Sequence, residues 1–374
     1  MTKKLNSLGL MSGTSGDGVD ASIIQSDGED KYNVIYNKYF EYEDQIFKMI
    51  HELKEKLNKP SDLSRYKDDL KTLERKITVF HAKIVKEIAV KDNLGIELVG
   101  FHGQTMYHNP EEKISKQLGD AKLLHQLLDK NIIYNFREND LNNGGQGAPL
   151  APIFHRLIAQ DKKLDLPLCI LNIGGISNIT ILKNYNIIDL KSRDIGPGNC
   201  MIDEWVRKNS EKKYDENGIL GMTGKKNEII FEQAIELFSS IKKNKLQSLD
   251  TKDFDISFAR GLSLEDGTAT LTDLTSKIIS SSLLNELEKI DNSKWQILLC
   301  GGGRKNKTLI EKIKKYTSNK FNIKLIDEYN INGDYVESQA FAYLAIRSYL
   351  GLVYSFPGTT GCQKACTGGS IIKI

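Results

Sequence analysis

The stretch GLMSGTSGDGVD, residues 9–20, decides the fold class of this 374-residue chain. Leu8 and Leu10 alternate with small or polar residues before its polar turn, and Val19 and Ala21 do so after it. Alternating apolar residues on both sides of a Gly/Ser/Thr turn are typical of a β-hairpin. Glycines let the backbone fold tightly enough for several N–H groups to converge on an anion. We therefore predict a phosphate-binding hairpin, with an ordinary hairpin turn as the alternative.

A second hairpin of the same kind is predicted at residues 168–182, LCILNIGGISNITIL. Its Gly-Gly turn comes about half a chain after the first turn, and a further glycine cluster at 301–303 follows the apolar segment 295–300. The sequence has neither a Walker A motif nor a G-x-G-x-x-G between a strand and a helix. Two such hairpins favour a duplicated α/β domain, as in the two-lobed ATPase architecture of sugar kinases, actin and the Hsp70 chaperones.

Composition narrows the class of protein. Hydrophobic residues make up 40% and charged residues 27%, which is enough to bury a core and excludes a disordered chain. The formal net charge of +3 is too small to indicate a nucleic-acid or membrane-surface partner. Cys362 and Cys366 lie four residues apart, but no second pair at zinc-finger spacing accompanies them, so we expect reduced thiols. Without a signal peptide or a long apolar run, a cytoplasmic location is expected.

Helical spacing and apolar runs predict the remaining elements. Strands are expected at 97–101 and 187–190, and a buried helix at 337–350. Further helices are expected at 46–94, 226–241, 272–290 and 305–316. We predict an N-terminal lobe over 1–165 and a C-terminal lobe over 166–374, with the C-terminal helix (about 337–374) able to cross back to the N-terminal lobe.

Eight motifs give the chain a specific resemblance. In order, they are GLMSGTSGDGVD (9–20), GFHGQTMYH (100–108), NFRENDLNNGGQGAPLAP (135–152), LNIGGISNIT (171–180), RDIGPGNCMID (193–203), LLCGGGRKN (298–306), GDYVESQAFAYLAIR (333–347) and SFPGTTG (355–361). Together they resemble the anhydro-N-acetylmuramic acid kinases over nearly the whole chain. The GQGAPL and ESQAFAYLA stretches are more specific to that family than any glycine loop.

The resemblance implies two duplicated ribonuclease-H-like lobes with an active-site cleft between them. It implies an ATP- and Mg²⁺-dependent kinase that hydrolytically opens 1,6-anhydro-N-acetylmuramic acid to the 6-phosphate during peptidoglycan recycling. It also implies a homodimer in the bacterial cytoplasm, with no nucleic-acid or membrane partner. The alternatives are a kinase for an ordinary sugar hydroxyl and an actin- or Hsp70-like ATPase.

Asp194 is the predicted catalytic base. It lies in RDIGPGN (193–199), beside a glycine-proline turn that follows a predicted strand, where a carboxylate can accept a proton. By resemblance to the family, it deprotonates the water that attacks the anomeric carbon. The alternative is a helix N-cap, since aspartate is favoured there.

The sugar is expected to contact five side chains. Arg137 has a guanidinium fork that suits the lactyl carboxylate of a muramic sugar, and its alternative is a surface ion pair with Glu138 or Asp140. Glu337 follows Asp334 at capping-box spacing, and only the family resemblance favours a substrate carboxylate over that structural role. The predicted sugar contacts are Gln104, Thr105, Arg137, Gln146 and Glu337.

The nucleotide is expected at the glycine turns. Asp17 is the predicted Mg²⁺ partner, acting through water, whereas Asp20 follows on the second strand. The third turn is predicted to hold adenosine, although a strand-to-helix turn needs glycine in any case. The predicted nucleotide residues are Gly13, Thr14, Ser15, Gly16, Asp17, Gly18, Val19, Asp20, Gly174, Gly175, Asn178, Gly301, Gly302, Gly303 and Asn306.

Three positions depart from the family pattern. Gly16 stands where a bulky apolar residue is usual, Ile195 replaces a threonine after the catalytic aspartate, and Gln247 stands where a lysine is expected. None of them removes an acid that the mechanism needs. We expect them to affect nucleotide affinity and rate rather than the class of reaction.

Overall fold

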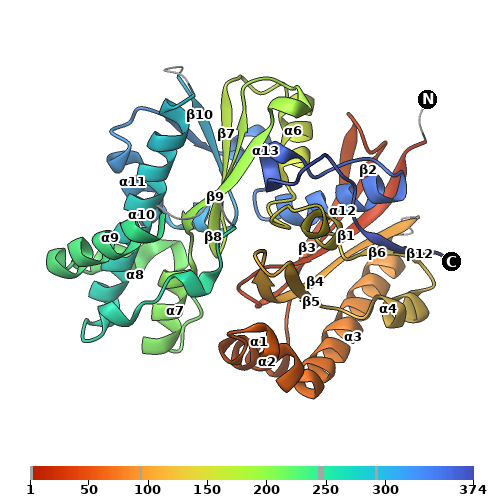
Figure 1. Ribbon diagram of the computed structural model, residues 1–374, viewed down its shortest axis with the longest axis horizontal. Helices are drawn as coiled ribbons and strands as arrows, with labels where there is room; N and C mark the ends of the chain where they lie inside the picture. The colour runs from red at the N-terminus through yellow and green to blue at the C-terminus, as the bar shows by residue number, and fades with distance from the viewer. Residues whose placement is uncertain (1–2, 93–94, 243–247, 291–293) are drawn as a thin grey trace. The chain divides into compact units, whose positions relative to one another are not determined.

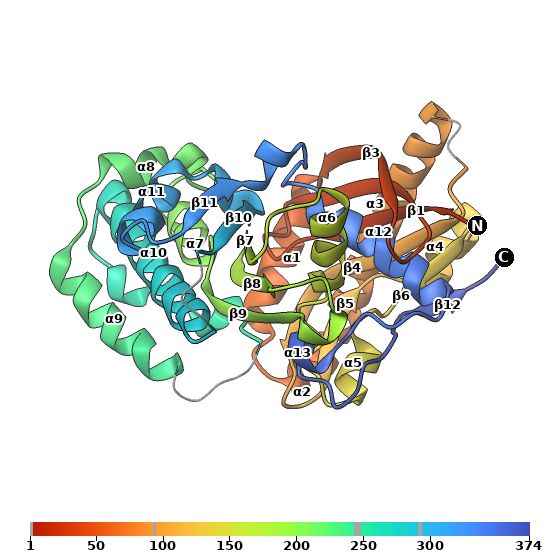
Figure 2. The same ribbon diagram turned by 90° about the horizontal axis from the view of Figure 1, so that it is seen from above.

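The computed structural model describes residues 3–92, 95–242, 248–290 and 294–374 (Figures 1 and 2). The chain forms two compact units. Unit 1 comprises Met1–Leu164, Tyr185–Leu190 and Asp334–Ile374, and unit 2 comprises Asp165–Asn184 and Lys191–Gly333.

The strands and helices are as follows. The strands are β1 (Leu5–Ser12), β2 (Gly18–Ser26), β3 (Tyr32–Glu41), β4 (Leu98–Asn109), β5 (Ile114–Leu118), β6 (Asn131–Tyr134), β7 (Leu168–Ile173), β8 (Ile176–Leu182), β9 (Lys191–Pro197), β10 (Gln296–Cys300), β11 (Asn322–Leu325) and β12 (Ser370–Ile372). The helices are α1 (Asp44–Lys56), α2 (Pro60–Arg65), α3 (Lys67–Asp92), α4 (Ala121–Leu128), α5 (Glu138–Asn142), α6 (Pro152–Asp161), α7 (Cys200–Asn209), α8 (Ile219–Thr223), α9 (Glu228–Lys242), α10 (Leu264–Glu288), α11 (Lys307–Tyr316), α12 (Val336–Tyr349) and α13 (Pro357–Thr360).

The two sheets share one topology. In unit 1 the order is β12-β6-β4-β1-β2-β3, with β5 paired to β4, and in unit 2 it is β11-β10-β7-β8-β9. In each, three antiparallel strands (β1–β3 or β7–β9) are followed by two that run parallel to the first (β4 and β6, or β10 and β11). This shared order confirms the predicted duplication of an α/β domain.

Both predicted hairpins are confirmed. β1 pairs with β2 around the first glycine turn (residues 12–18), and β7 pairs with β8 around the second (173–176). Leu8, Leu10 and Ile23 are fully buried. The alternation of apolar and polar residues therefore correctly predicted strands whose apolar face is covered.

Helix α12 lies against the sheet of unit 1, along β1, β2 and β4 (Figure 1). Gly9 of β1 makes this approach possible, because a Cβ there would overlap the Ser338 carbonyl oxygen of α12. A Cβ at Gly100 of β4 would overlap the carbonyl oxygen of Phe341 in the same way. The prediction of a buried helix is confirmed, but it ends at Tyr349 rather than extending to 374. Only α13 and β12 follow it.

Three predicted boundaries were wrong. β4 continues to Asn109 through a β-bulge at Gly103, whose φ is +74°, so the HGQT segment lies inside a strand. Residues 187–189 form a 3₁₀ helix, and the strand follows as β9. α10 begins at Leu264 instead of 272, where Ser263 caps it by accepting from the Asp266 N–H.

Each unit has its own apolar core. In unit 1, β1, β2 and β4 pack on α1 and α3 through residues such as Ile50 and Ile77. In unit 2, β7, β8 and β10 pack on α10 and α11 through Ile279, Leu283 and Leu309. Among the described residues, no helix has the length and apolar composition needed to cross a membrane.

Candidate functional site

The side chain of Gln104 in β4 forms hydrogen bonds with the first glycine turn. Its amide Nε2 donates to the Gly13 carbonyl at 2.9 Å, and its Oε1 accepts from the Ser12 hydroxyl at 2.5 Å. Ser12 also donates to the Gly18 carbonyl, while Thr14 and Ser15 are exposed at the tip. Gln104 is fully buried, so these contacts favour a role in shaping the turn over direct contact with sugar.

Acidic side chains gather beside this turn. Asp17 accepts from the Ser15 hydroxyl at 2.6 Å. The pKa of Tyr39 is raised above its usual value, first by burial and then by the charges of Asp17, Glu41 and Asp20. Carboxylate oxygens are the ligands that Mg²⁺ takes in proteins, usually with several waters retained. Asp17 therefore offers a carboxylate at this turn to which a hydrated Mg²⁺ could bind through water.

Arg137 is fixed by uncharged acceptors. Its Nε and Nη2 lie 3.2 and 3.0 Å from Nε2 of His102, and its Nη1 donates to the Gly147 carbonyl at 2.7 Å. His102 is buried, and burial together with the Arg137 charge holds its pKa well below the usual value. The imidazole is therefore neutral, with Nδ1 donating to the Gly103 carbonyl at 2.8 Å and Nε2 accepting from Arg137. These contacts hold the guanidinium of Arg137 between His102 and Gly147.

The acids suggested as ion-pair partners of Arg137 have other contacts. Glu138 accepts from the Asn135 side chain at 2.9 Å. Asp140 is buried and accepts from the Gly147 N–H at 2.7 Å and the Thr360 hydroxyl at 2.5 Å. Glu138 and Asp140 are thus both hydrogen-bonded to groups other than Arg137.

The other predicted sugar residues lie on three segments of unit 1. Gln146 sits between Gly145 and Gly147, and its N–H donates to the Thr360 carbonyl at 2.8 Å. Thr105 of β4 accepts from the Gln117 amide at 3.2 Å. Glu337 is half-buried in the first turn of α12. Since Tyr335 is the N-cap of this helix and no side chain caps it, the capping-box interpretation was wrong.

In unit 2, three predicted glycine segments meet at one edge of the sheet. β7 and β10 are parallel neighbours, and Asn172 at the end of β7 pairs with Cys300 at the end of β10. The N–H groups of Gly198 and Asn199 donate to the carbonyls of Gly175 and Gly174, both at 2.8 Å. Gly301, with φ +78°, leaves no space for a side chain beside Asn172. The carboxyl ends of these strands are where ligands bind in many open α/β sheets.

Asp194 lies on β9 directly opposite Asn178 of β8. Paired residues on neighbouring antiparallel strands point to the same face, so the predicted base and a predicted phosphate residue are neighbours. Asp194 is half-buried, and its Oδ2 accepts from the Leu249 N–H at 2.8 Å. The helix that follows is α7, with Asn199 as its N-cap, so the alternative of a cap at Asp194 was wrong.

The third glycine turn is braced by an ion pair that the sequence did not reveal. Arg304 donates from Nε and Nη2 to the two carboxylate oxygens of Asp327 at 2.7 and 2.9 Å, and from Nη1 to the Gly301 carbonyl at 3.1 Å. The bond from Arg304 holds the pKa of Asp327 below its usual value. Asn306 caps α11 by accepting from the Leu309 N–H, so its oxygen is already used within the fold.

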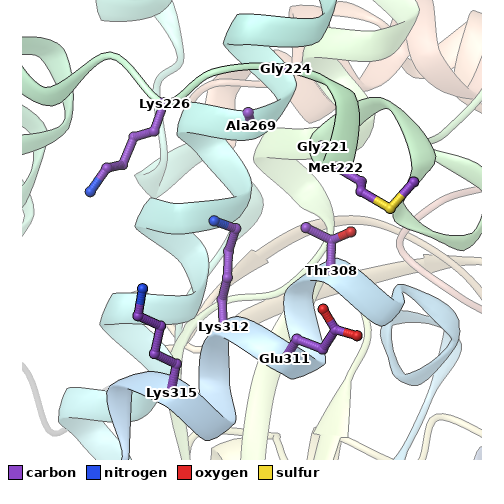
Figure 3. A pocket seen from close by; sticks show the side chains of 9 residues that line it. All are labelled: Gly221, Met222, Gly224, Lys226, Ala269, Thr308, Glu311, Lys312 and Lys315. Carbon is purple, nitrogen blue, oxygen red and sulfur yellow. The ribbon is translucent and has the colours of Figure 1, made fainter.

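A pocket of about 310 Å³ lies beside α11 in unit 2 (Figure 3). Three lysine side chains enter it, but Lys312 pairs with Asp273, and Lys226 pairs with Glu228 at 2.9 Å. Lys315 lies one turn after Glu311, which also lines the pocket. None of the predicted site residues lines it, and these acids offset its positive charge.

Comparison with known proteins decides the family. The model of the family described as anhydro-N-acetylmuramic acid kinase matches residues 5–373. The chain belongs to the anhydro-N-acetylmuramic acid kinase family. The resemblance drawn from the eight motifs is thereby confirmed.

Curated members of this kinase family align along the whole chain. The anhydro-N-acetylmuramic acid kinase of Pelagibacter ubique (strain HTCC1062) is 54% identical over 373 residues, covering 100% of both chains. That of Zymomonas mobilis is 35% identical over 375 residues, covering 98% of this chain and 99% of the relative.

Two solved structures resemble this kinase family member more distantly. The (R)-2-hydroxyglutaryl-CoA dehydratase component A of Acidaminococcus fermentans is 12% identical with a TM-score of 0.44, covering 92% of this chain and 99% of that one. A ROK family glucokinase of Streptomyces griseus, solved with glucose and AMPPNP, is 11% identical with a TM-score of 0.40, covering 91% of this chain and 99% of that one.

Two departures from the kinase family pattern have a local explanation. Gly16 has φ +62°, and a Cβ there would come within 2.8 Å of the Ile50 side chain, so a larger residue needs Ile50 to move. Ile195 is buried in the core with Ile279 and Leu283. Gln247 lies outside the described residues.

Proposed function

We propose that this protein transfers the γ-phosphoryl group of ATP to 1,6-anhydro-N-acetylmuramic acid while water opens the internal ether. The product is N-acetylmuramic acid 6-phosphate, an intermediate of peptidoglycan recycling. Membership of the kinase family over residues 5–373 and 54% identity to a curated member support this reaction. The pairing of Asp194 with Asn178 at the edge where the glycine turns of unit 2 meet is the observation that carries the mechanism.

Asp194 acts as the general base in this mechanism. Its carboxylate takes a proton from a water molecule, and the hydroxide oxygen bonds to carbon 1 of the sugar as the bond from carbon 1 to oxygen 6 breaks. Oxygen 6 then bonds to the γ-phosphorus, and the bond from that phosphorus to the β–γ bridging oxygen breaks to release ADP. The Leu249 N–H, 2.8 Å from Oδ2, stabilises the charged form of Asp194 and orients it.

The glycine turns bind the nucleotide in this proposal. Residues Gly13–Asp20, Gly174, Gly175 and Asn178 contact the phosphates, and Gly301–Gly303 with Asn306 contact adenosine. Arg304 keeps the third turn in place. Mg²⁺, when bound, neutralises phosphate charge, and Asp17 would hold it through water.

The sugar contacts come from unit 1. Arg137 binds the lactyl carboxylate with its guanidinium, while Thr105, Gln146 and Glu337 bind hydroxyl or acetamido groups. Gln104 acts indirectly, since its amide braces the first glycine turn.

Replacing Asp194 tests the base. We expect Asp194→Asn to bind ATP nearly as tightly as the wild type but to lose sugar-dependent ADP release by roughly 10³-fold or more, because the amide cannot take the proton. The exposed Asp165→Asn is the control and should keep full activity. Turnover retained in Asp194→Asn would refute the assignment of the base.

The mass of the product tests the reaction itself. Addition of one phosphoryl group and one water to the anhydro sugar supports the proposal. Addition of a phosphoryl group alone, or a preference for sugars without the anhydro bridge, would indicate an ordinary sugar kinase. ATP hydrolysis at the same rate without sugar would indicate an actin- or Hsp70-like ATPase.

The homodimer and the cytoplasmic location are part of the same proposal. Both come from the family resemblance. Sedimentation at micromolar concentration should give twice the mass of one chain, and cell fractionation should recover the activity with cytoplasmic enzymes.

A further inference from the structure

Two cysteines and one carboxylate meet beneath a surface loop of unit 1. Cys362 and Cys366 follow α13, while Asp140 belongs to α5, and Figure 2 shows these two helices side by side. The two thiol sulfurs and a carboxylate oxygen of Asp140 lie within 4.8 Å of one another. Among the described residues, this is the one group of three His, Cys, Asp or Glu side chains close enough to share a metal ion.

The three groups are buried but shallow. Cys362, Cys366 and Asp140 are 1%, 8% and 1% exposed, whereas residues 363–365 between the cysteines are exposed to solvent. The cluster therefore lies close to the protein surface. A shell that excludes water strengthens any charge interaction inside it.

Asp140 is a buried carboxyl group whose hydrogen-bond donors are uncharged. The Gly147 N–H and the Thr360 hydroxyl donate to it, and the Cys362 thiol lies within hydrogen-bonding reach. The absence of a side chain at Gly145 leaves the space that the carboxylate fills. Burying a carboxylate without a positive partner is costly, so a cation at this point would stabilise the fold.

The backbone around the cluster is fixed before any ion arrives. The Gln363 N–H donates to the Asn143 carbonyl at 3.0 Å, and the Gln146 N–H donates to the Thr360 carbonyl at 2.8 Å. Cys366 and Ser355 exchange two backbone hydrogen bonds, each of 3.1 Å. The sulfurs and the carboxylate are thus presented by segments already joined to each other, which reduces the entropy lost on binding.

We propose that Asp140, Cys362 and Cys366 bind one thiophilic divalent cation, Zn²⁺, with water in the fourth position. Two thiols release their protons to solvent, and the two thiolates and the carboxylate bond to the ion without any change of oxidation state. Zinc–sulfur bonds of about 2.3 Å place tetrahedral sulfurs about 3.8 Å apart, and a zinc–oxygen bond of about 2.0 Å places the oxygen about 3.5 Å from each sulfur, so the cluster needs to contract by about 1.3 Å at most. Thiolate ligands select against Mg²⁺ and Ca²⁺. The ion itself takes no part in the proposed phosphoryl transfer.

Cobalt substitution tests the site in the full-length protein. The protein is reduced with a phosphine, freed of metal and titrated with Co²⁺ under anaerobic conditions. We expect a near-ultraviolet thiolate-to-cobalt band that saturates at one ion per chain and is displaced by Zn²⁺. Zn²⁺ should also raise the melting temperature. Absence of the band, or an unchanged melting temperature with Zn²⁺, would overturn the proposal.

Cysteine variants assign the ligands. Cys362→Ser and Cys366→Ser should lose the band, and Asp140→Asn, which keeps a hydrogen-bond acceptor, should weaken Co²⁺ binding about tenfold or more. Cys300→Ser is the matched control, since Cys300 is also a buried thiol but lies in unit 2. Circular dichroism checks folding, with Cys362→Ala as the substitute if a serine variant unfolds. A band that survives in both Cys362→Ser and Cys366→Ser, or a wild type that only forms a disulfide and binds no ion when reduced, would refute the site.

Discussion

Arg137 illustrates how neutral groups can position a charged side chain. A guanidinium that pairs with a carboxylate loses much of its attraction for a second anion, whereas His102 and the Gly147 carbonyl are uncharged acceptors. Because the pKa of His102 lies well below 6.5, this arrangement persists throughout the neutral pH range. His102 is therefore a positioning residue for Arg137.

Arg137→Lys should show whether sugar binding depends on the geometry of the guanidinium group or only on its positive charge. A lysine keeps the positive charge but cannot contact His102 and Gly147 while gripping a carboxylate in two places. We expect the KM for the anhydro sugar to rise about tenfold or more, with a smaller change in kcat, because a charge-assisted hydrogen bond is worth about 1.5–3 kcal/mol. Steady-state kinetics with sugar and ATP varied separately measures both constants.

The control for that experiment is Arg75→Lys, on an exposed face of α3. It should leave both KM values unchanged. A rise in the KM for ATP with the sugar KM unaltered in Arg137→Lys would place Arg137 at the nucleotide instead.

Residue types were easier to predict than their partners. Asp194 was selected for its place beside a glycine-proline turn and for the family resemblance, and Arg137 for its guanidinium fork. The contacts of Asp140 and Arg304 and the bracing role of Gln104 were not predicted, since their partners Thr360, Asp327 and Gly13 lie on other segments of the chain. Only the folded chain brings these pairs together.

At the scale of the element, the close packing of helix α12 on the sheet requires glycine, which has no side chain, at two strand positions. Gly9 and Gly100 occupy neighbouring strands, and both allow backbone of α12 to touch the sheet. Ser22 and Ser338 then approach to 2.6 Å, which fixes the helix in register.

A single methyl group at Gly9 should therefore be costly. In Gly9→Ala the new Cβ overlaps backbone atoms of Ser338 and Ala342, which cannot rotate away as a side chain could. We expect the free energy of unfolding of unit 1 to fall by about 2 kcal/mol or more. Urea unfolding followed by circular dichroism measures it.

Gly95→Ala is the matched control, because no atom lies within 4 Å of a Cβ at that position. Its effect should stay within about 0.5 kcal/mol. Equal effects of the two substitutions would show that the close packing of α12 contributes little.

Elements with strong apolar patterns could be predicted, and those with polar interiors could not. The hairpins and α12 are regular and buried on their apolar side. β4 was cut short because Gly103, Gln104 and Thr105 are typical of a turn, yet a bulge keeps them in the strand. The start of α10 was missed because Thr268, Thr270 and Thr272 have low helix propensity, although all three are fully buried.

At the scale of the whole molecule, the two units share a topology but differ in their titratable groups. All six histidines lie in unit 1, at positions 51, 81, 102, 108, 125 and 155, and both tryptophans, Trp205 and Trp295, lie in unit 2. Burial lowers the pKa of His81 and His155 to about 4 and that of His108 to about 3. Together with His102, four imidazoles of unit 1 are thus held neutral.

Mild acid should therefore weaken unit 1 selectively. Below pH 6.5 these four histidines take up protons in the unfolded chain but not in the folded one, so stability falls as the pH decreases from 7 to 5. Each contributes a slope of about 1.4 kcal/mol per pH unit. We expect the urea midpoint seen by circular dichroism to fall over this range, while the midpoint seen by tryptophan fluorescence, which reports unit 2, moves less.

His155→Gln tests the cause. It removes one neutral imidazole from α6 and should reduce the loss of stability between pH 7 and 5. Tryptophan and circular dichroism midpoints that fall together by the same amount would contradict the assignment to unit 1.

The return of residues 334–374 to unit 1 has a consequence for synthesis on the ribosome. Every segment of unit 2 emerges before the strand-covering helix α12 is made, so unit 2 can fold while translation continues. The faces of β1 and β4 at Gly9 and Gly100 stay uncovered until residues 336–349 of α12 have been made. A nascent chain stalled before residue 334 would thus expose the face of the sheet that α12 covers in the folded protein.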